Sequence, residues 1–97
     1  MSETRGVRAV VEVLARALTD QPDHVRVTES QHKATTLVEL YVAPGDLGKV
    51  IGKQGRTAAA LRTLASTAGE RDGKTVTLEI RDTPYGGAGP DNRKADR

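Results

Sequence analysis

The segment of residues 47–69, LGKVIGKQGRTAAALRTLASTAG, constrains this chain more than any other feature. It contains no acidic residue, whereas Asp and Glu are interspersed with Lys and Arg over the rest of the chain. Its cations are Lys49, Lys53, Arg56 and Arg62. In its middle, residues 52–55 (Gly-Lys-Gln-Gly) separate two stretches whose apolar residues recur at helical spacing. We therefore expect two helices joined by a glycine-bounded turn, where exposed N–H groups and the dipole of the second helix favour negative charge.

The composition limits which functions the chain can have. Its 97 residues suffice for one small domain, with 36% hydrophobic and 29% charged residues. A net charge of +2 is a weak argument for a nucleic-acid partner, and the uneven distribution of the cations is a stronger one. The absence of Cys excludes disulfides, thiolate metal ligands and cysteine nucleophiles. Tyr41 and Tyr85 are the only aromatic residues, so a nucleic-acid surface must rely on backbone contacts, cations and aliphatic side chains.

The chain carries no recognisable membrane or export signal. No apolar run approaches the roughly 18 residues of a membrane-spanning helix. The N-terminus also lacks the apolar segment of a secretory signal peptide. We therefore expect a cytoplasmic protein without membrane insertion.

The first part of the chain predicts a helix followed by a β-hairpin. The helix carries an apolar stripe formed by Val7, Val10, Val11, Leu14 and Leu18. Pro22 ends it, because its ring cannot continue the helical hydrogen bonds. Val25 and Val27 alternate with polar residues and predict a first strand, and residues 31–33 form a polar break before a second strand over residues 36–42. The inward face of that second strand consists of Thr36, Val38, Leu40 and Val42.

The second part predicts two helices and a third strand. Pro44 opens a short helix whose buried face includes Leu47, Val50 and Ile51. After the glycine turn, a second helix carries a stripe of Ala58, Leu61, Ala65 and Ala68. We expect Gly69 to cap its C-terminus and residues 70–74 to form a polar loop. Alternating Val76, Leu78 and Ile80 then predict the third strand.

These elements define an α+β fold in the order α-β-β-α-α-β. Three helices on one face of a three-stranded sheet would bury every apolar stripe named above. The domain extends over residues 1–82. Residues 83–97 contain Pro, Gly and charges but no large aliphatic side chain, which predicts a disordered C-terminal tail.

A G-x-x-G pattern occurs three times, and its context distinguishes the copies. The copy at residues 45–48 spans a strand end and contains Asp46, which would repel phosphate, and the copy at residues 86–89 lies in the tail. Only the copy at residues 52–55 lies between two amphipathic helices with cations around it. Turn chemistry alone allows a simpler reading, in which glycine merely permits the bend.

The full arrangement resembles a KH domain, in which V-I-G-x-x-G lies between two helices and strands precede and follow them. The additional helix and strand at the N-terminus make it similar to the bacterial type II form. The stretch VAPGDLGKVIGKQGRTAAALRT resembles the signature of the small bacterial RNA-binding proteins of the KhpA (YlqC) type. The opening helix, the Pro22-Asp23 turn and the TVTLEI strand also match, so the resemblance covers about residues 7–82.

The resemblance implies a function as well as a fold. It implies binding of single-stranded RNA and a role as an RNA chaperone, without a cofactor. It implies action with a partner of the KhpB (Jag/EloR) type in post-transcriptional regulation, cell elongation, cell-wall biogenesis and envelope homeostasis. Self-association into a homodimer through the KH domain is also expected from the family.

In a KH domain the glycine loop clamps the backbone of about four nucleotides. Mapped onto this chain, Gly52 and Gly55 would let the RNA backbone approach without a Cβ in the way. Lys53 and Gln54 would project from the loop, one as a charge and the other as a neutral hydrogen-bonding group.

Further RNA contacts are expected beside the loop. Lys49 and Arg56 would contact phosphates, and Val50 and Ile51 would lie under the bases, although a role in the core suits both equally well. The edge of the strand at residues 36–42 should form the opposite wall. Arg62 fits an RNA contact and a solvated surface charge equally well.

Other classes of function have less support. An enzyme is not expected, because residues 47–54 break the Walker A pattern and neither His24 nor His32 belongs to a catalytic motif. The acids show no metal-ligand spacing. The main alternative is a protein-interaction or dimerisation module with little RNA affinity, in which the alanine-rich helix at residues 57–68 packs against a second copy. Protein interfaces favour aromatic residues, Met and Arg at their centres, and this chain has few such anchors. A pure docking surface also would not need the cationic loop.

Overall fold

The computed structural model describes residues 6–82, and its elements follow the predicted order. The helices and strands are α1 (Val7–Leu18), β1 (Arg26–His32), β2 (Thr35–Val42), α2 (Leu47–Ile51), α3 (Arg56–Arg71) and β3 (Thr75–Asp82). Short 3₁₀ turns at Pro22–His24, Pro44–Asp46 and Lys53–Gly55 precede β1, α2 and α3. The tail predicted at residues 83–97 lies outside the described residues.

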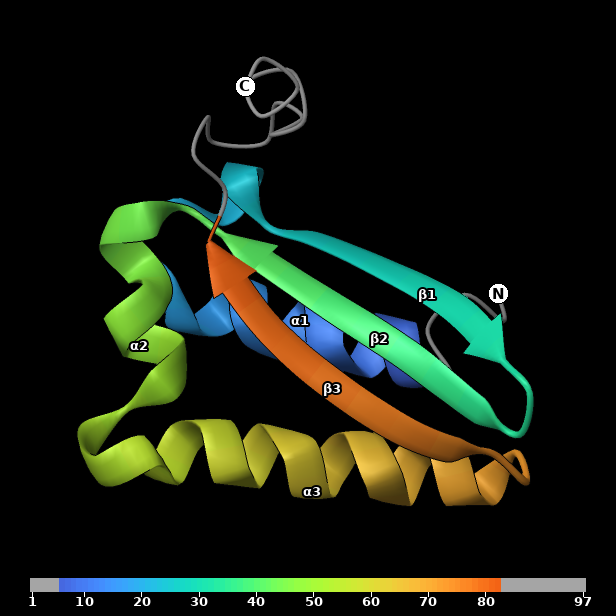
Figure 1. Ribbon diagram of the computed structural model, residues 1–97. Helices are drawn as coiled ribbons and strands as arrows, with labels where there is room; N and C mark the ends of the chain where they lie inside the picture. The colour runs from blue at the N-terminus through green and yellow to red at the C-terminus, as the bar shows by residue number, and fades with distance from the viewer. Residues whose placement is uncertain (1–5, 83–97) are drawn as a thin grey trace, which may run out of the picture.

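The sheet is mixed, with strand order β1-β2-β3. β1 and β2 form an antiparallel hairpin, whereas β2 and β3 run parallel. Parallel neighbours need a long crossover, and α2 and α3 provide it. In Figure 1, β2 lies in the middle of the sheet, α1 lies behind it, and α3 runs along the side of β3. The predicted α+β architecture is therefore confirmed.

The core lies between the sheet and the helices, and β2 contributes most to it. Every second residue of β2 is buried, as the alternation of its side chains requires. These residues are the predicted set, Thr36, Val38, Leu40 and Val42. The helical side of the core consists of Val7, Val11, Ala15, Val50, Ala58, Leu61 and Ala65. Leu18, predicted to belong to the buried stripe of the first helix, is instead exposed at the end of α1.

The hairpin turn is tighter than predicted. The expected polar break at residues 31–33 is wrong for its first two members, because Gln31 pairs with Thr36 and His32 with Thr35 in the ladder. The turn consists of Lys33 and Ala34, and Lys33 adopts a left-handed φ of 59°. β1 is an edge strand with mostly exposed residues, so polar side chains are compatible with pairing there.

The prediction that Gly69 caps the second helix is also wrong. α3 continues to Arg71, and the left-handed residue that follows it is Gly73, with φ +72°. Gly69 is buried inside the helix, where a Cβ would meet Cγ2 of Val76 and lie 3.2 Å from the carbonyl oxygen of Lys74. Gly69 therefore permits close packing of α3 on β3, and the loop before β3 is shorter than expected.

Candidate nucleic-acid interface

The glycine turn adopts a backbone conformation that ordinary residues disfavour. Gly52 has φ 79° and ψ 170°, a region populated almost only by glycine. Gln54 and Gly55 follow with left-handed φ values of 56° and 74°. The turn is closed by a hydrogen bond from Gly55 N to Gly52 O (3.0 Å), and Gly52 N in turn donates to Gly48 O (2.8 Å). The turn is therefore a defined structure rather than a simple gap between α2 and α3.

The two glycines of the turn have different environments. A Cβ on Gly52 would meet the side chain of Thr57 and lie 2.9 Å from the Thr57 nitrogen. A Cβ on Gly55 would have no neighbour within 4 Å. Gly52 is therefore required by the packing of the turn against α3, whereas the surface at Gly55 is open to an approaching ligand.

The turn leads directly into the N-terminus of α3, which consists of 16 residues. No side chain caps this end, and the first turn contains no acidic residue. Lys53 and Arg56 are exposed on either side of Gly55, the N-cap residue. The Arg56 side chain donates from Nη2 to Oε1 of Gln54 (2.9 Å), which leaves the amide N–H₂ of the exposed Gln54 available as a donor. The helix dipole and the cations thus combine to favour an anion here, while the N–H groups of Gly55 and Arg56 already bond to the carbonyl oxygens of Gly52 and Lys53.

Lys49 lies on the side of α2 that faces the end of α1. Its Nζ is 3.4 Å from Oδ2 of Asp20, a partner that sequence reasoning missed, because the two residues meet only through the packing of α1 and α2. Lys49 and Asp20 are 45% and 76% exposed, so their pair contributes little to stability and can exchange for another anion. Lys49 is accessible to a phosphate only in competition with Asp20.

Asp46 supports this part of the surface from inside. It is only 2% exposed, and its carboxylate accepts hydrogen bonds from the backbone nitrogens of Asp20 (3.2 Å) and Gln21 (2.9 Å). It therefore joins the segment after α1 to the start of α2. Its negative charge is engaged in the fold rather than presented to a ligand at the surface.

Val50 and Ile51 are placed differently from one another. Val50 is fully buried in the core beneath α2. Ile51 is half-buried beside the turn and keeps part of its surface accessible. Only Ile51 of this pair can touch a ligand directly, and Val50 supports the helix from below.

The prediction that β2 supplies an edge opposite the loop is wrong, because β2 is paired on both sides. The sequence does not reveal this, because strand order depends on tertiary pairing. The strand beside α2 and α3 is β3, and no strand within residues 6–82 pairs with its other side (Figure 1). Arg62 lies at this edge and donates from Nε to the carbonyl oxygen of Leu78 (3.2 Å). The turn, α3 and β3 thus border one continuous surface.

Some cations elsewhere on the described surface are paired with carboxylates. Arg81 lies 3.4 Å from a carboxylate oxygen of Glu39 and 3.9 Å from one of Glu79, on the open face of the sheet. Burial and the neighbouring Glu39 raise the pKa of Tyr41 on the same face. No carboxylate within residues 6–82 lies within 4.0 Å of Lys53, Arg56 or Arg62, and the same holds for Arg26, Lys33 and Arg71.

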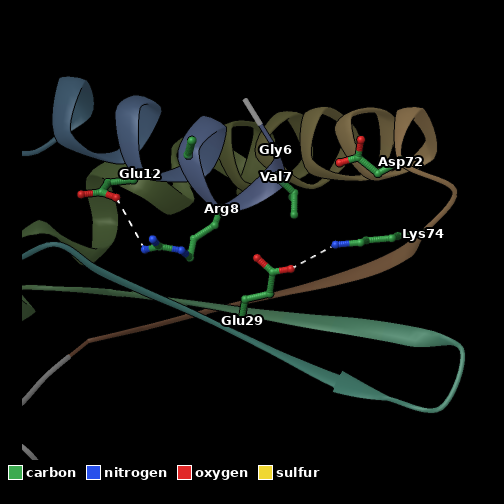
Figure 2. Close-up of a pocket in the computed structure, with 8 residues that line it drawn as sticks. Gly6, Val7, Arg8, Glu12, Glu29, Asp72 and Lys74 are labelled. Carbon is green, nitrogen blue, oxygen red and sulfur yellow. Dashed lines mark hydrogen bonds and ion pairs between the residues drawn. The ribbon is translucent and has the colours of Figure 1, made fainter. Parts of the chain in front are cut away.

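A pocket of about 290 Å³ lies away from the glycine turn, between the start of α1, β1 and the turn from α3 into β3 (Figure 2). It contains both signs of charge, with Glu29 3.5 Å from Lys74 and Glu12 3.9 Å from Arg8. None of the predicted site residues lines it. Within residues 6–82 no cluster of His, Asp or Glu could hold a metal ion, and no helix could cross a membrane.

The order α-β-β-α-α-β, the mixed sheet and the glycine turn between α2 and α3 define a KH domain of type II. The sequence matches the family model described as "KhpA/KhpB, KH domain" over residues 8–80. The chain belongs to this KhpA/KhpB KH-domain family.

Curated relatives agree with this assignment. The RNA-binding protein KhpA of Aquifex aeolicus is 51% identical over 74 residues, which are 76% of this chain and 94% of the relative. The RNA-binding protein KhpA of Mycobacterium bovis is 47% identical over 73 residues, 75% of this chain and 88% of the relative. Because these relatives are named as RNA-binding proteins, the expectation of a binding protein rather than an enzyme is confirmed at the level of the family.

Solved structures show a similar fold at low sequence identity. The chain aligns with Era from Aquifex aeolicus at a TM-score of 0.58 and 22% identity, covering 80% of this chain and 31% of Era. A second Era structure, in complex with MgGDPNP and nucleotides of 16S ribosomal RNA, aligns at a TM-score of 0.57 and 22% identity, covering 91% and 32%. The chain spans about a third of these larger proteins.

Proposed function

We propose that this chain binds single-stranded RNA and holds its sugar–phosphate backbone at residues 52–55. The observation that carries the proposal is the uncapped, acid-free N-terminus of α3, which opens beside Gly55 where a ligand meets no side chain. A phosphate placed there would lie at the positive end of the helix dipole. The names of the curated relatives support RNA as the ligand.

The residues around the turn have separate roles in this proposal. Lys53 and Arg56 neutralise phosphates on both sides of the turn, and Gln54 donates from its free amide. Lys49 contributes a further charge when phosphate displaces Asp20. Ile51 offers its half-buried side chain to a base, because few aromatic residues are available for stacking.

Three or four phosphate contacts give modest, salt-sensitive affinity. Each neutralised phosphate contributes about −0.7 to the slope of log K against log salt for a single strand. The proposal therefore predicts a slope of about −2 to −3 for one domain.

The test is fluorescence anisotropy of a labelled, unstructured RNA octamer across a salt series. The variant Lys53→Asp/Gln54→Asp places two carboxylates at the turn. The control Lys33→Asp/Ala34→Asp changes the net charge equally in the exposed hairpin turn between β1 and β2. We expect the first variant to lose binding and the control to keep it, with both folded by circular dichroism. Equal binding by both variants would refute the proposal.

We propose further that the chain acts in the cytoplasm as an RNA chaperone together with a KhpB-type partner, in post-transcriptional regulation, cell elongation and envelope homeostasis. The family resemblance supports this wider role, and the matched family description names both KhpA and KhpB. Co-purification of the tagged chain with the KhpB-type protein of the same cell tests it. If the KhpB-type protein is recovered neither with nor without ribonuclease treatment, the partnership is contradicted.

A second role, self-association, is favoured by an apolar surface on the outer side of α1 and α3. The residues of this surface are Ala9, Val10, Val13, Leu14 and Leu64. Val13 and Leu64 are 66% and 46% exposed and belong to the same surface. A homodimer through this surface would leave residues 52–55 free and would raise apparent RNA affinity through effective concentration.

Sedimentation equilibrium of the wild type and of Val13→Asp tests the homodimer. We expect a dimer for the wild type and a folded monomer for the variant. A wild type that is monomeric at all concentrations, or a variant that still forms the dimer, would contradict self-association through this surface.

A further inference from the structure

We propose that Arg62 reads the RNA base that lies against β3 and selects guanine or cytosine over adenine and uracil. This inference rests on the proposed RNA-binding function and adds a base preference to it. The observation behind it is the hydrogen bond from Arg62 Nε to the carbonyl oxygen of Leu78, at 3.2 Å. This partly buried contact joins α3 to the middle of β3.

The bond fixes the orientation of the guanidinium group. Leu78 lies in the edge strand β3, where alternate carbonyl groups have no partner in the sheet, and its carbonyl oxygen accepts the bond from Arg62 Nε. A guanidinium group is planar, and a bond at Nε therefore restricts where both terminal nitrogens can point. Arg62 is held in place before any ligand arrives.

Within the described part of the chain, the terminal nitrogens of Arg62 have no partner. Within residues 6–82, no carboxylate lies within 4.0 Å of Arg62, and its only side-chain hydrogen bond is the one to Leu78. Arg56 and Arg81, by contrast, are engaged with Gln54 and with two glutamates. The residue remains exposed, so two N–H₂ groups are available side by side for a ligand.

The location suits a base rather than the clamped backbone. Position 62 lies six residues after the first residue of α3, so it is about 9 Å along the helix axis from the turn. That distance equals about three stacked nucleotides of one strand, which is within the four or so that a KH loop clamps. RNA held at residues 52–55 and running along β3 would bring a base to Arg62.

The chemistry of the free donors determines which bases fit. Two adjacent N–H groups match two adjacent acceptors, which guanine presents as O6 and N7 and cytosine presents as O2 and N3. Adenine places a donor beside its acceptor, and in uracil the N3–H donor separates the two oxygens. Because the Arg62 guanidinium is partly solvated, we expect it to discriminate against the wrong base at the lower end of the range for bidentate contacts, about 5- to 10-fold in affinity.

A purely structural reading assigns Arg62 only to covering the open edge of β3. In that case its replacement would change fold stability or the affinity for all RNAs together. A role in base reading would change the ratio of affinities between RNAs of different sequence. The ratio therefore separates the two readings.

The experiment compares uridine octamers that carry two central guanines, cytosines or adenines with the all-uridine octamer, at one salt concentration. We expect the wild type to bind an octamer with central guanines or cytosines 5- to 10-fold more tightly than the adenine octamer and the all-uridine octamer. Arg62→Lys keeps the charge without the planar fork and should reduce all ratios to within 2-fold. Arg71→Lys, at the exposed end of α3, is the matched control and should keep the wild-type ratios.

The outcomes separate this inference from the proposed function. Salt-dependent binding by the wild type without base preference would overturn the role of Arg62 and leave RNA binding intact. A preference that Arg62→Lys retains would overturn it as well. If guanine is the preferred base, 7-deazaguanine should abolish the preference, and its persistence would refute the predicted O6/N7 contact. Absence of all RNA binding would instead refute the proposed function itself.

Discussion

Gly52 packs directly against Thr57, so a methyl group on Gly52 would meet the Thr57 side chain and lie 2.9 Å from the Thr57 nitrogen. The turn and the first turn of α3 therefore form one unit. This contact explains how a short turn can hold the N-terminus of α3 in a fixed, open position.

Gly52→Ala should therefore disrupt the turn more than Gly55→Ala. Both glycines have positive φ, but only Gly52 also lacks space for a Cβ. We expect Gly52→Ala to lower the free energy of unfolding by about 2–3 kcal/mol, because strain and a clash add together. Gly55→Ala should cost about 1 kcal/mol, the ordinary penalty of a left-handed alanine. Urea denaturation measures the free energy of unfolding of both variants. An equal loss in Gly52→Ala and Gly55→Ala would contradict the role of Thr57.

Gly69→Ala should destabilise the protein although it improves helix propensity. An exposed Gly-to-Ala change inside a helix normally stabilises by about 1 kcal/mol. Here the methyl group would collide with Val76, so we expect a net loss of about 1–3 kcal/mol. Thermal unfolding measures this loss. Because the glycine turn is remote from Gly69, the folded variant should keep wild-type RNA affinity. A gain in stability would contradict the expectation and would mean that β3 shifts to accommodate the methyl group at little cost.

Asp46→Ala should be strongly destabilising. The buried carboxylate accepts backbone hydrogen bonds from Asp20 and Gln21, and its loss leaves two donors without that acceptor. We expect the free energy of unfolding to fall by about 2–4 kcal/mol. Asp46→Asn retains one acceptor oxygen and should fall between the wild type and Asp46→Ala in urea denaturation. A cost below about 0.5 kcal/mol for Asp46→Ala would mean that the two bonds are unimportant.

Asp20→Asn should raise RNA affinity with little effect on stability. Its exposed pair with Lys49 contributes less than about 1 kcal/mol to folding. Freed Lys49 should make the salt slope more negative by up to about 0.7 and tighten binding about 2- to 3-fold. Glu12→Gln removes the same charge from a half-buried glutamate of α1, which pairs with Arg8 and Arg16, and serves as the control in the anisotropy assay. An equal gain from both variants would indicate a general charge effect.

The periodic elements of this fold were predictable from the sequence, and the exceptions have physical causes. β2 alternates strictly because one of its faces is buried, and the helices carry apolar stripes for the same reason. His32 was predicted to lie in a turn, because an exposed edge strand needs no apolar residue to mark it. Gly69 was predicted to be a cap, because sequence alone does not distinguish a glycine that ends a helix from one that makes room inside a helix for a neighbouring side chain, here Val76.

The candidate site was predictable in its residues but not in its pairings. The glycine turn and its cations are local in sequence, and the structure places them together at the start of α3. The partner of Lys49, the anchor of Arg62 and the position of β3 as the edge strand all depend on contacts between distant segments. Such contacts leave no periodic signal.

The most direct test of the central claim is a ¹H–¹⁵N NMR titration of the labelled protein with an unstructured RNA octamer. We predict that the largest amide shift changes occur at residues 51–58, with smaller changes along β3 and none at the hairpin turn of Lys33. Changes concentrated on the apolar surface around Val13 and Leu64, or no changes at all, would contradict RNA binding at the glycine turn.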